Sequence, residues 1–205
     1  MIETDRERLA ADWYDQNGEK WAAQRKKLSE PSFWAQEYEA FKRLRKPEGA
    51  LLEIGSGSGR EAIEWIRMGY RYTGIDPSTT LIQIAKQTEP KGHYFLTSVY
   101  QMPFQPNTFD AFSSWALLPH APKERVGTAL DAIRKVLKLD AWGLIAMREG
   151  EGEKQEQATG RWFSYYAQDE FEKILKERGF AVSRKEKKAS RADLVWLTFF
   201  VQRVE

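Results

Sequence analysis

The sequence of 205 residues contains no cysteine and only two histidines, His93 and His120. The lack of cysteine excludes disulfides, thiolate metal sites and a cysteine nucleophile, and two isolated histidines do not have the spacing of a metal site. No apolar run approaches the roughly 20 residues that a membrane span requires. Catalysis must therefore depend on other side chains, and no metal is expected.

Neither sign of charge dominates, because 32 basic residues face 30 acidic ones. The charges are interspersed, so a broad basic face for nucleic acid is not expected. The N-terminal stretch lacks the apolar centre of a secretory signal, which makes a cytoplasmic location the expectation. A hydrophobic content of 41%, with 13% aromatic residues, is enough for one sizeable core, and the length suits a single domain over 1–205.

Helical and strand periods alternate along most of the chain. Residues 1–46 carry apolar residues at helical spacing, punctuated at Asn17-Gly18 and Pro31, and predict two or three helices that cap a core over 47–205. Short apolar runs then alternate with helical patterns, which is typical of parallel βαβ units. A polar loop is expected after residue 149, and an exposed hairpin turn between two terminal strands is expected over 184–191. Strands are expected near 51–54, 71–75, 93–97, 109–115, 142–147 and 194–201, with helices over 78–87 and 168–178.

The segment LLEIGSGSGR, residues 51–60, is the most informative motif. A strand runs into three alternating glycines, which allow the backbone to approach a ligand and to adopt conformations that other residues avoid. A bound nucleoside or phosphate is the natural inference. A dinucleotide fingerprint needs a further glycine where the chain has Arg60, so the pattern fits a ligand without a diphosphate better.

Asp76 follows the first glycine by about twenty residues, at the end of the second predicted strand. A carboxylate at that place can accept hydrogen bonds from both hydroxyls of a ribose. The alternative is that Asp76 only caps the helix that follows it. The glycine loop and the acid together favour the ribose interpretation.

With these motifs the sequence resembles the class I methyltransferases, whose first motif is an acid followed by alternating glycines, as in Glu53 to Gly59. VYQMPFQPNTFDAFSS resembles the family's stretch into the fourth strand, and DAIRKVLKLDAWGLIAM resembles its fourth helix and fifth strand. The tail RWFSYYAQDEFEKILKERGF is similar to one branch of small bacterial and archaeal members. The resemblance implies a Rossmann-like, doubly wound α/β fold with a mostly parallel seven-stranded sheet, its last strand antiparallel and helices on both faces.

The resemblance also implies that S-adenosylmethionine is the cofactor, with S-adenosylhomocysteine as the product. The glycines would pass under its methionine part, Glu53 would orient that part, and Asp76 would hold the ribose. Pro77 would lie beside the adenine, while Ser98 stands where the family usually has an acid for the adenine amino group, with the backbone of Val99 beside it. The expected cofactor-binding residues are Glu53, Gly55, Ser56, Gly57, Gly59, Arg60, Asp76, Pro77, Ser98, Val99 and Trp115.

Two side chains after the fourth predicted strand are candidates for the acceptor side. Trp115 would emerge at the carboxyl edge of the sheet, where ligands bind in doubly wound folds, and could wall the methyl group; the alternative is a core aromatic. His120 matches a histidine common in the same branch and is the only candidate general base with an ordinary pKa near neutrality. A structural role in holding its loop is the alternative.

Charged and aromatic residues after the fifth strand fall in the loop that faces the substrate in such folds. Arg161, within RWF, is the strongest candidate for setting a charge preference, and a solvated loop is the alternative for any single member. The expected substrate-side residues are Trp115, His120, Arg148, Arg161 and Tyr165, with Glu149, Glu151, Glu153 and Tyr166 nearby.

In-line displacement at a sulfonium needs orientation more than acid-base machinery. The sequence therefore predicts a methyltransferase acting on a small molecule, without naming the acceptor. Three alternatives stay open: an RNA or protein methyltransferase, a noncatalytic protein that binds S-adenosylmethionine, and an NAD-dependent oxidoreductase.

Overall fold

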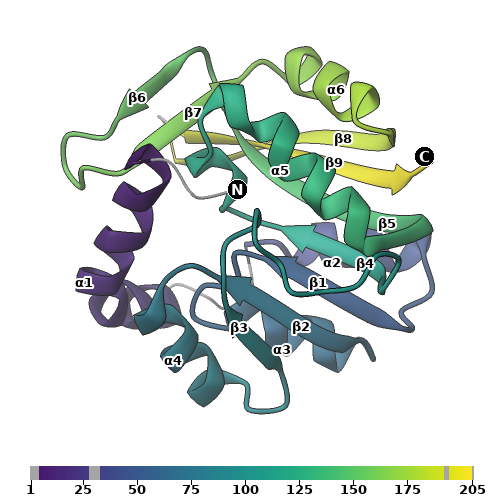
Figure 1. Cartoon of the computed structure of the whole chain (residues 1–205), viewed down its shortest axis with the longest axis horizontal. Helices are drawn as coiled ribbons and strands as arrows, with labels where there is room; N and C mark the ends of the chain where they lie inside the picture. The colour runs from purple at the N-terminus through teal and green to yellow at the C-terminus, as the bar shows by residue number, and fades with distance from the viewer. Residues whose placement is uncertain (1–4, 28–32, 192–193, 205) are drawn as a thin grey trace.

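A computed structural model describes residues 5–27, 33–191 and 194–204. Helices alternate with strands from residue 50 onward, as the periodicity predicts, and two helices precede the first strand (Figure 1). Each helix between two parallel strands is a crossover that returns the chain to the same edge of the sheet. The helices are α1 (Asp5–Lys27), α2 (Ala35–Leu44), α3 (Arg60–Arg67), α4 (Thr79–Thr88), α5 (Lys123–Val136) and α6 (Gln168–Glu177), with a 3-10 turn η1 (Leu118–His120).

The described strands form one sheet in which β3, β2, β1, β4 and β5 are parallel neighbours in that order. Strand β9 lies antiparallel beside β5, and β8 lies antiparallel beside β9. The Rossmann-like prediction with an antiparallel last strand is therefore confirmed. The strands are β1 (Ala50–Ile54), β2 (Arg71–Asp76), β3 (His93–Leu96), β4 (Phe109–Ser114), β5 (Leu137–Glu149), β6 (Glu153–Gln155), β7 (Trp162–Tyr166), β8 (Phe180–Arg191) and β9 (Leu194–Arg203).

Apolar side chains cover both faces of the sheet, which explains the nearly continuous apolar runs of its central strands. One face packs against α5 and α6, with Phe112, Ile133, Phe171 and Phe199 fully buried there. The opposite face packs against α2 and α3, through an aromatic cluster that we call the tryptophan cluster. It contains Trp34, Tyr38, Phe41, Trp65, Tyr70, Trp115 and Trp196.

Strands β6 and β7 form a hairpin in a stretch that the sequence analysis expected to be a polar loop. Strand β7 buries Phe163, Ser164 and Tyr166 and pairs in parallel with the last residues of β5, from Arg148 opposite Tyr165. Strand β6 has only three residues, all polar, so it carries no apolar alternation to reveal it. The hairpin extends the sheet beyond the seven strands expected (Figure 1).

Helix α1 continues through Asn17-Gly18, where the sequence analysis expected punctuation. The Asn17 side chain donates to the carbonyl of Trp13, one turn back in the same helix. A Cβ at Gly18 would lie 3.0 Å from Cγ2 of Thr80 in α4. Gly18 therefore allows α1 and α4 to approach closely, and its role is packing.

The basic stretch 184–191 belongs to β8 and is not the exposed hairpin turn that its charges suggested. Its lysines are paired across the surface: Lys185 with Asp169 and Glu172, Lys187 with Glu149, and Lys188 with Glu37. Residues 192–193, between β8 and β9 in the chain, lie outside the described residues. Within the described part of the chain, no helix is long and apolar enough to cross a membrane.

Gly143 tests the packing of the central strands. It lies in β5 opposite Phe112 of β4, and a Cβ there would lie 1.8 Å from Cε1 of the buried Phe112 ring. We expect Gly143→Ala to lower the free energy of unfolding by about 1–3 kcal/mol, because the buried Phe112 ring has no space to move into. Urea denaturation measures this value.

The control is the same change in a Phe112→Leu background, where a smaller side chain relieves the clash. Gly143→Ala should then cost less than it does alone, as a double-mutant cycle would report. Equal losses in both backgrounds, or no loss in either, would contradict this packing.

Candidate functional site

A cleft of about 710 Å³, partly open to solvent, lies at the carboxyl ends of the parallel strands. Strand-end ligand sites of this kind are typical of doubly wound sheets. Its floor comes from the loops that follow β1, β2, β3 and β4, and α1 closes one side. The lining residues are Glu7, Ala10, Ala11, Tyr14, Trp21, Gly55, Gly57, Asp76, Pro77, Leu81, Val99, Tyr100, Ala116, Leu117, His120 and Ala121.

The three glycines after β1 all have positive φ, but each solves a different steric problem. A Cβ at Gly55 would lie 2.5 Å from Cβ of Leu117, and one at Gly59 would lie 2.9 Å from the backbone of Ala85 in α4. These two glycines allow the loop to pack against its neighbours. A Cβ at Gly57 would clash with nothing and would come into ordinary contact, at 3.8 Å, with the Trp21 ring that also lines the cleft, so Gly57 is the one that leaves room for a ligand.

Asp76 joins the glycine loop to the start of α4. One carboxylate oxygen accepts from the backbone N–H of Gly57, at 2.9 Å, and the other accepts from the N–H of Ser78, at 2.9 Å. The N-cap itself is Ser78, whose side chain accepts from Leu81 N–H at 3.2 Å. Asp76 thus both supports the helix start and lines the cleft, so the two interpretations of this residue are compatible.

Glu53 and Arg60 lie outside the lining of the cleft. Glu53 is only 1% exposed and accepts a hydrogen bond from the hydroxyl of Tyr72. Burial, with the nearby charge of Glu61, raises the pKa of Glu53 well above its usual value. Arg60 pairs with Glu61. The expected contact of Glu53 and Arg60 with a cofactor stays a prediction, and in this structure Glu53 faces Tyr72 of β2.

Of the other residues expected to bind the cofactor, only some line the cleft. Pro77 and Val99 line the cleft, whereas Ser56 and Ser98 do not. Both serine side chains are buried, and neither hydroxyl has a hydrogen-bond partner among the described residues. Ser98 precedes Val99 in the chain. One of these unsatisfied hydroxyls therefore lies beside the predicted adenine end of the cleft.

Trp115 belongs to the tryptophan cluster and not to the cleft, which corrects its predicted place in the cofactor and substrate sites. Its ring lies 4.7 Å from that of Trp34 and 5.2 Å from that of Tyr38, centroid to centroid. The alternation of β4 carries Ala111 and Trp115 to the same face. The core interpretation is therefore the right one, and the neighbouring Ala116 and Leu117 line the cleft in its place.

The sequence analysis did not include α1 in the site, yet α1 supplies the cleft with Glu7, Ala10, Ala11, Tyr14 and Trp21. These positions recur at helical spacing along one face, which is the signal that could have found them. Figure 1 shows α1 reaching from β7 to α4, across the carboxyl edge of the sheet.

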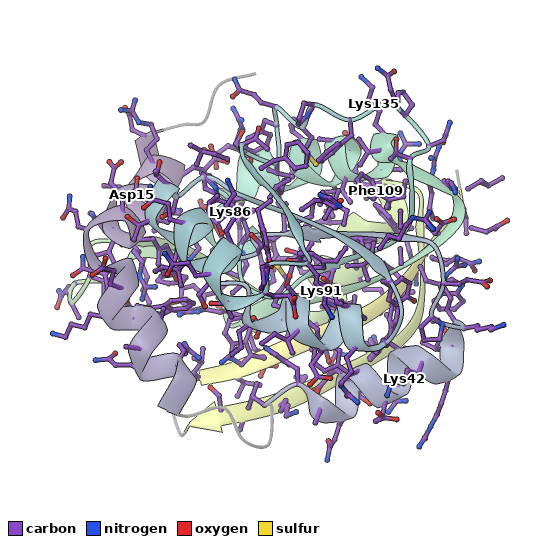
Figure 2. All side chains as sticks on the ribbon, turned by 90° about the horizontal axis from the view of Figure 1, so that it is seen from below. Asp15, Lys42, Lys86, Lys91, Phe109 and Lys135 are labelled. Carbon is purple, nitrogen blue, oxygen red and sulfur yellow. The ribbon has the colours of Figure 1, made fainter. Side chains whose placement is uncertain are left out.

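Hydrogen bonds hold both halves of α1 in place. Near its middle, Asp15 accepts from the Ser78 hydroxyl at 2.7 Å and from Thr80 N–H at 3.1 Å, and Figure 2 shows Asp15 beside α4. At its start, the Tyr100 hydroxyl donates to Glu7. The same serine that caps α4 thus also fastens α1 over the cleft.

His120 lines the cleft from η1 and is only 8% exposed. Its Nδ1 lies 2.8 Å from the carbonyl oxygen of Trp162. Because a carbonyl only accepts, Nδ1 carries the proton of the neutral ring and Nε2 carries the lone pair. Burial, together with the nearby charges of Arg161 and Arg148, lowers the pKa of His120 from 6.5 to about 3, although the hydrogen bond to Trp162 acts in the opposite direction.

Arg148, Arg161 and Tyr165 lie together behind the His120 side of the cleft and do not line it. Arg161 donates to the hydroxyl of Tyr14 at 2.7 Å and stacks on Trp13 at 4.3 Å, which attaches α1 to the β6–β7 hairpin. Of the neighbouring acids, Glu153 accepts from Lys123 N–H at 2.7 Å and from Ser164 at 2.8 Å, a structural role.

The matching family model covers residues 52–145 and is described as a methyltransferase domain. Residues 52–145 therefore resemble a methyltransferase domain, over slightly less than half of the chain. This match supports the resemblance noted in the sequence. No significant match is found among curated proteins.

Several solved structures agree with this chain in fold. One is 1,6-didemethyltoxoflavin N1-methyltransferase of Burkholderia thailandensis, with bound 1,6-didemethyltoxoflavin and S-adenosylhomocysteine: TM-score 0.76, 16% identity, covering 100% of this chain and 93% of that one. Magnesium protoporphyrin IX methyltransferase of Synechocystis PCC 6803, with bound S-adenosylmethionine, gives 0.73 and 13%, covering 99% of each. The cyclase SpnF gives 0.68 and 16%, covering 82% and 80%.

The buried neutral state of His120 predicts how acid affects the stability of the protein. The unfolded chain binds this proton below about pH 6.5, whereas the folded chain binds it only below about pH 3. The histidine therefore destabilises the fold as the pH falls through that window, by up to about 1.4 kcal/mol per pH unit.

The matched variant is His120→Asn, whose amide N–H can still reach the Trp162 carbonyl but does not titrate. Urea denaturation should show the wild type losing stability relative to His120→Asn as the pH falls from about 7 to about 4. Parallel pH profiles would contradict a neutral, buried His120.

Proposed function

We propose that this protein is a methyltransferase that binds S-adenosylmethionine in the cleft that α1 closes on one side. It transfers the methyl group to a small molecule by in-line displacement. The supporting observation is the arrangement of Gly57 and Asp76 on one cleft wall, with the loop left open at Gly57 and a carboxylate beside it. The donor and the acceptor would share this cleft, with the acceptor at the His120 end.

The residues present fit a nucleoside carrying an amino-acid chain. A side chain at Gly57 would fill the space between the loop and Trp21, so the glycine makes a cradle there. Asp76 lines the cleft, and a carboxylate oxygen can accept two hydrogen bonds, so its backbone contacts are compatible with ribose hydroxyls. The buried Ser98 hydroxyl, without a partner among the described residues, would gain one from a polar group at the adenine end.

The cofactor, when bound, supplies an electrophilic methyl group on a sulfonium. The chain's own part is to orient the reactants and exclude water. Helix α1 covers the cleft with Ala10, Ala11 and Tyr14, and Leu117 closes it from the sheet side. The neutral His120 presents its Nε2 lone pair as a hydrogen-bond acceptor for an acceptor molecule. With a pKa of about 3 it is a poor general base, so orientation carries most of the predicted catalysis.

The substrates named for two neighbours, 1,6-didemethyltoxoflavin and magnesium protoporphyrin IX, support a small-molecule acceptor. RNA is a weaker candidate, because the lysines of β8 are paired with acids. A protein that binds the cofactor without methyl transfer is the second candidate, supported by a neighbour named as a cyclase. The cytoplasmic location and the single domain with a helical cap stay predictions.

The first experiment is calorimetric titration with S-adenosylhomocysteine and, for comparison, NADH. We expect micromolar binding of the former alone, because the loop has Arg60 where a dinucleotide site needs glycine. Binding of NADH alone would favour the oxidoreductase alternative. No binding of either by folded protein would overturn the proposed cofactor.

Gly57→Val tests the cradle. The side chain would enter the cleft, and we expect the affinity for S-adenosylhomocysteine to fall by at least about tenfold. Gly152→Val is the matched control, since Gly152 also has a positive φ, with nothing within 4 Å of its Cβ position, but lies next to β6. An equal change of affinity in both variants, or in neither, would contradict the site.

Asp76→Ala tests the ribose contact. Loss of hydrogen bonds to the hydroxyls should weaken binding of S-adenosylhomocysteine by about 1–3 kcal/mol, measured by the same titration. The control is Asp131→Ala, which removes a carboxylate of α5 that pairs with Arg178. This variant should bind S-adenosylhomocysteine normally. Normal binding by a folded Asp76→Ala protein would exclude Asp76 as the ribose ligand.

A further inference from the structure

Two arginines with nearly buried side chains share one carboxylate behind the His120 end of the cleft. Arg148 ends β5 and Arg161 precedes β7, and each side chain is only 11% exposed. Glu156 accepts from Arg161 at 3.0 Å, but its other oxygen is 3.9 Å from Arg148, beyond hydrogen-bond distance. Two positive charges therefore face one negative charge in this cluster, which we call the arginine cluster.

Arg148 uses little of its hydrogen-bonding capacity. A guanidinium has five N–H donors, yet the described contact is a single long one, 3.5 Å to the Tyr165 hydroxyl. Its Nε is buried and has no partner among the described residues. Burial lowers the pKa of Arg148, as expected for a desolvated cation. A buried charge with so few partners is costly for the fold alone, and the negative charge of a nearby ligand would offset it.

Aromatic rings connect the arginine cluster to the cleft. The Arg148 guanidinium lies 3.5 Å from the centre of the Phe163 ring, and that ring lies 4.4 Å from the centre of the His120 ring. Arg161 holds the Tyr14 hydroxyl, and both Tyr14 and His120 line the cleft. A molecule beside His120 would thus have aromatic side chains around it and two guanidiniums directly behind them.

His120 itself favours an acceptor that arrives already ionised. Burial opposes protonation of His120, and the arginines that would attract an anion oppose it as well, so the site is poorly suited to removing a proton. An anionic nucleophile needs no base. Its negative charge and the positive charge of the sulfonium cancel when the methyl carbon bonds to the nucleophile and its bond to sulfur breaks.

We propose that the methyl acceptor is a small aromatic anion, placed against Tyr14 and His120 with its negative charge toward Arg148 and Arg161. The proposal rests on the proposed function, because the acceptor must meet the cofactor in the same cleft. Arg148 and Arg161 are then residues that determine specificity, with Glu156 holding their side chains and limiting the net positive charge.

The test uses three probes of one shape and different charge: 2-naphthoate, 2-naphthamide and 2-naphthylmethylammonium. Equilibrium dialysis measures their binding to the protein saturated with S-adenosylhomocysteine. We expect the anion to bind at least about tenfold more tightly than the amide, and the ammonium most weakly, since tenfold corresponds to only about 1.4 kcal/mol. Equal affinities in protein that binds S-adenosylhomocysteine would overturn the proposal.

Variants assign the preference to the cluster. Arg148→Met and Arg161→Met should each reduce the preference for naphthoate over naphthamide to less than about threefold. Arg148→Lys should keep most of this preference. Glu156→Gln should strengthen naphthoate binding, a result that a merely structural cluster would not give. Arg184→Met is the matched control, because Arg184 also pairs with a carboxylate, Glu186, and lies 5.6 Å from the Phe200 ring, but in β8.

The affinity for S-adenosylhomocysteine, measured on every variant, separates the two proposals. It should stay within about twofold of wild type when Arg148 or Arg161 is replaced. An anion preference that survives both replacements would overturn the assignment to these arginines. Failure of the wild type itself to bind S-adenosylhomocysteine would instead overturn the proposed function, and the acceptor proposal with it.

Discussion

The carboxylate of Asp76 holds together the parts from which the site is built. It accepts from Gly57 in the loop after β1 and from Ser78 at the start of α4, and the Ser78 hydroxyl in turn donates to Asp15 of α1. Three segments far apart in the sequence thus meet through one buried acid and one serine. Because each segment lines the cleft, its shape depends on this connection more than on any single lining residue.

Local pattern was enough to predict the sheet, the glycine loop and Asp76. Strand runs, glycines and the acid at the strand end are signals that neighbouring residues carry by themselves. Helix α1 was predicted only as a helix, because its spacing shows one inward face without showing what that face meets. The β6–β7 hairpin was missed, since three polar residues of β6 gain their strand form by pairing with β7 and not from apolar alternation.

Side-chain direction decided the remaining differences. Trp115 was predicted at the cleft because it follows a strand end, yet the alternation of β4 sends it to the opposite face, into the tryptophan cluster. Glu53 belongs to the sequence motif, but its side chain faces Tyr72 of β2 and does not line the cleft. Position along a strand therefore predicts which edge a residue reaches, whereas the two-residue period decides whether it reaches the ligand.

The two ends of the cleft differ in their electrostatics, and that difference constrains the chemistry. Asp76 places a carboxylate at the proposed ribose end, while two guanidiniums lie behind the end that contains His120. Buried charges act strongly on each other when little water separates them. Burial keeps His120 neutral, and the positive charge that would draw in an anion acts in the same direction, so attraction of the acceptor and removal of its proton are opposing tasks here. An enzyme that relies on orientation, and on an acceptor ionised before it binds, satisfies both constraints with the residues this chain provides.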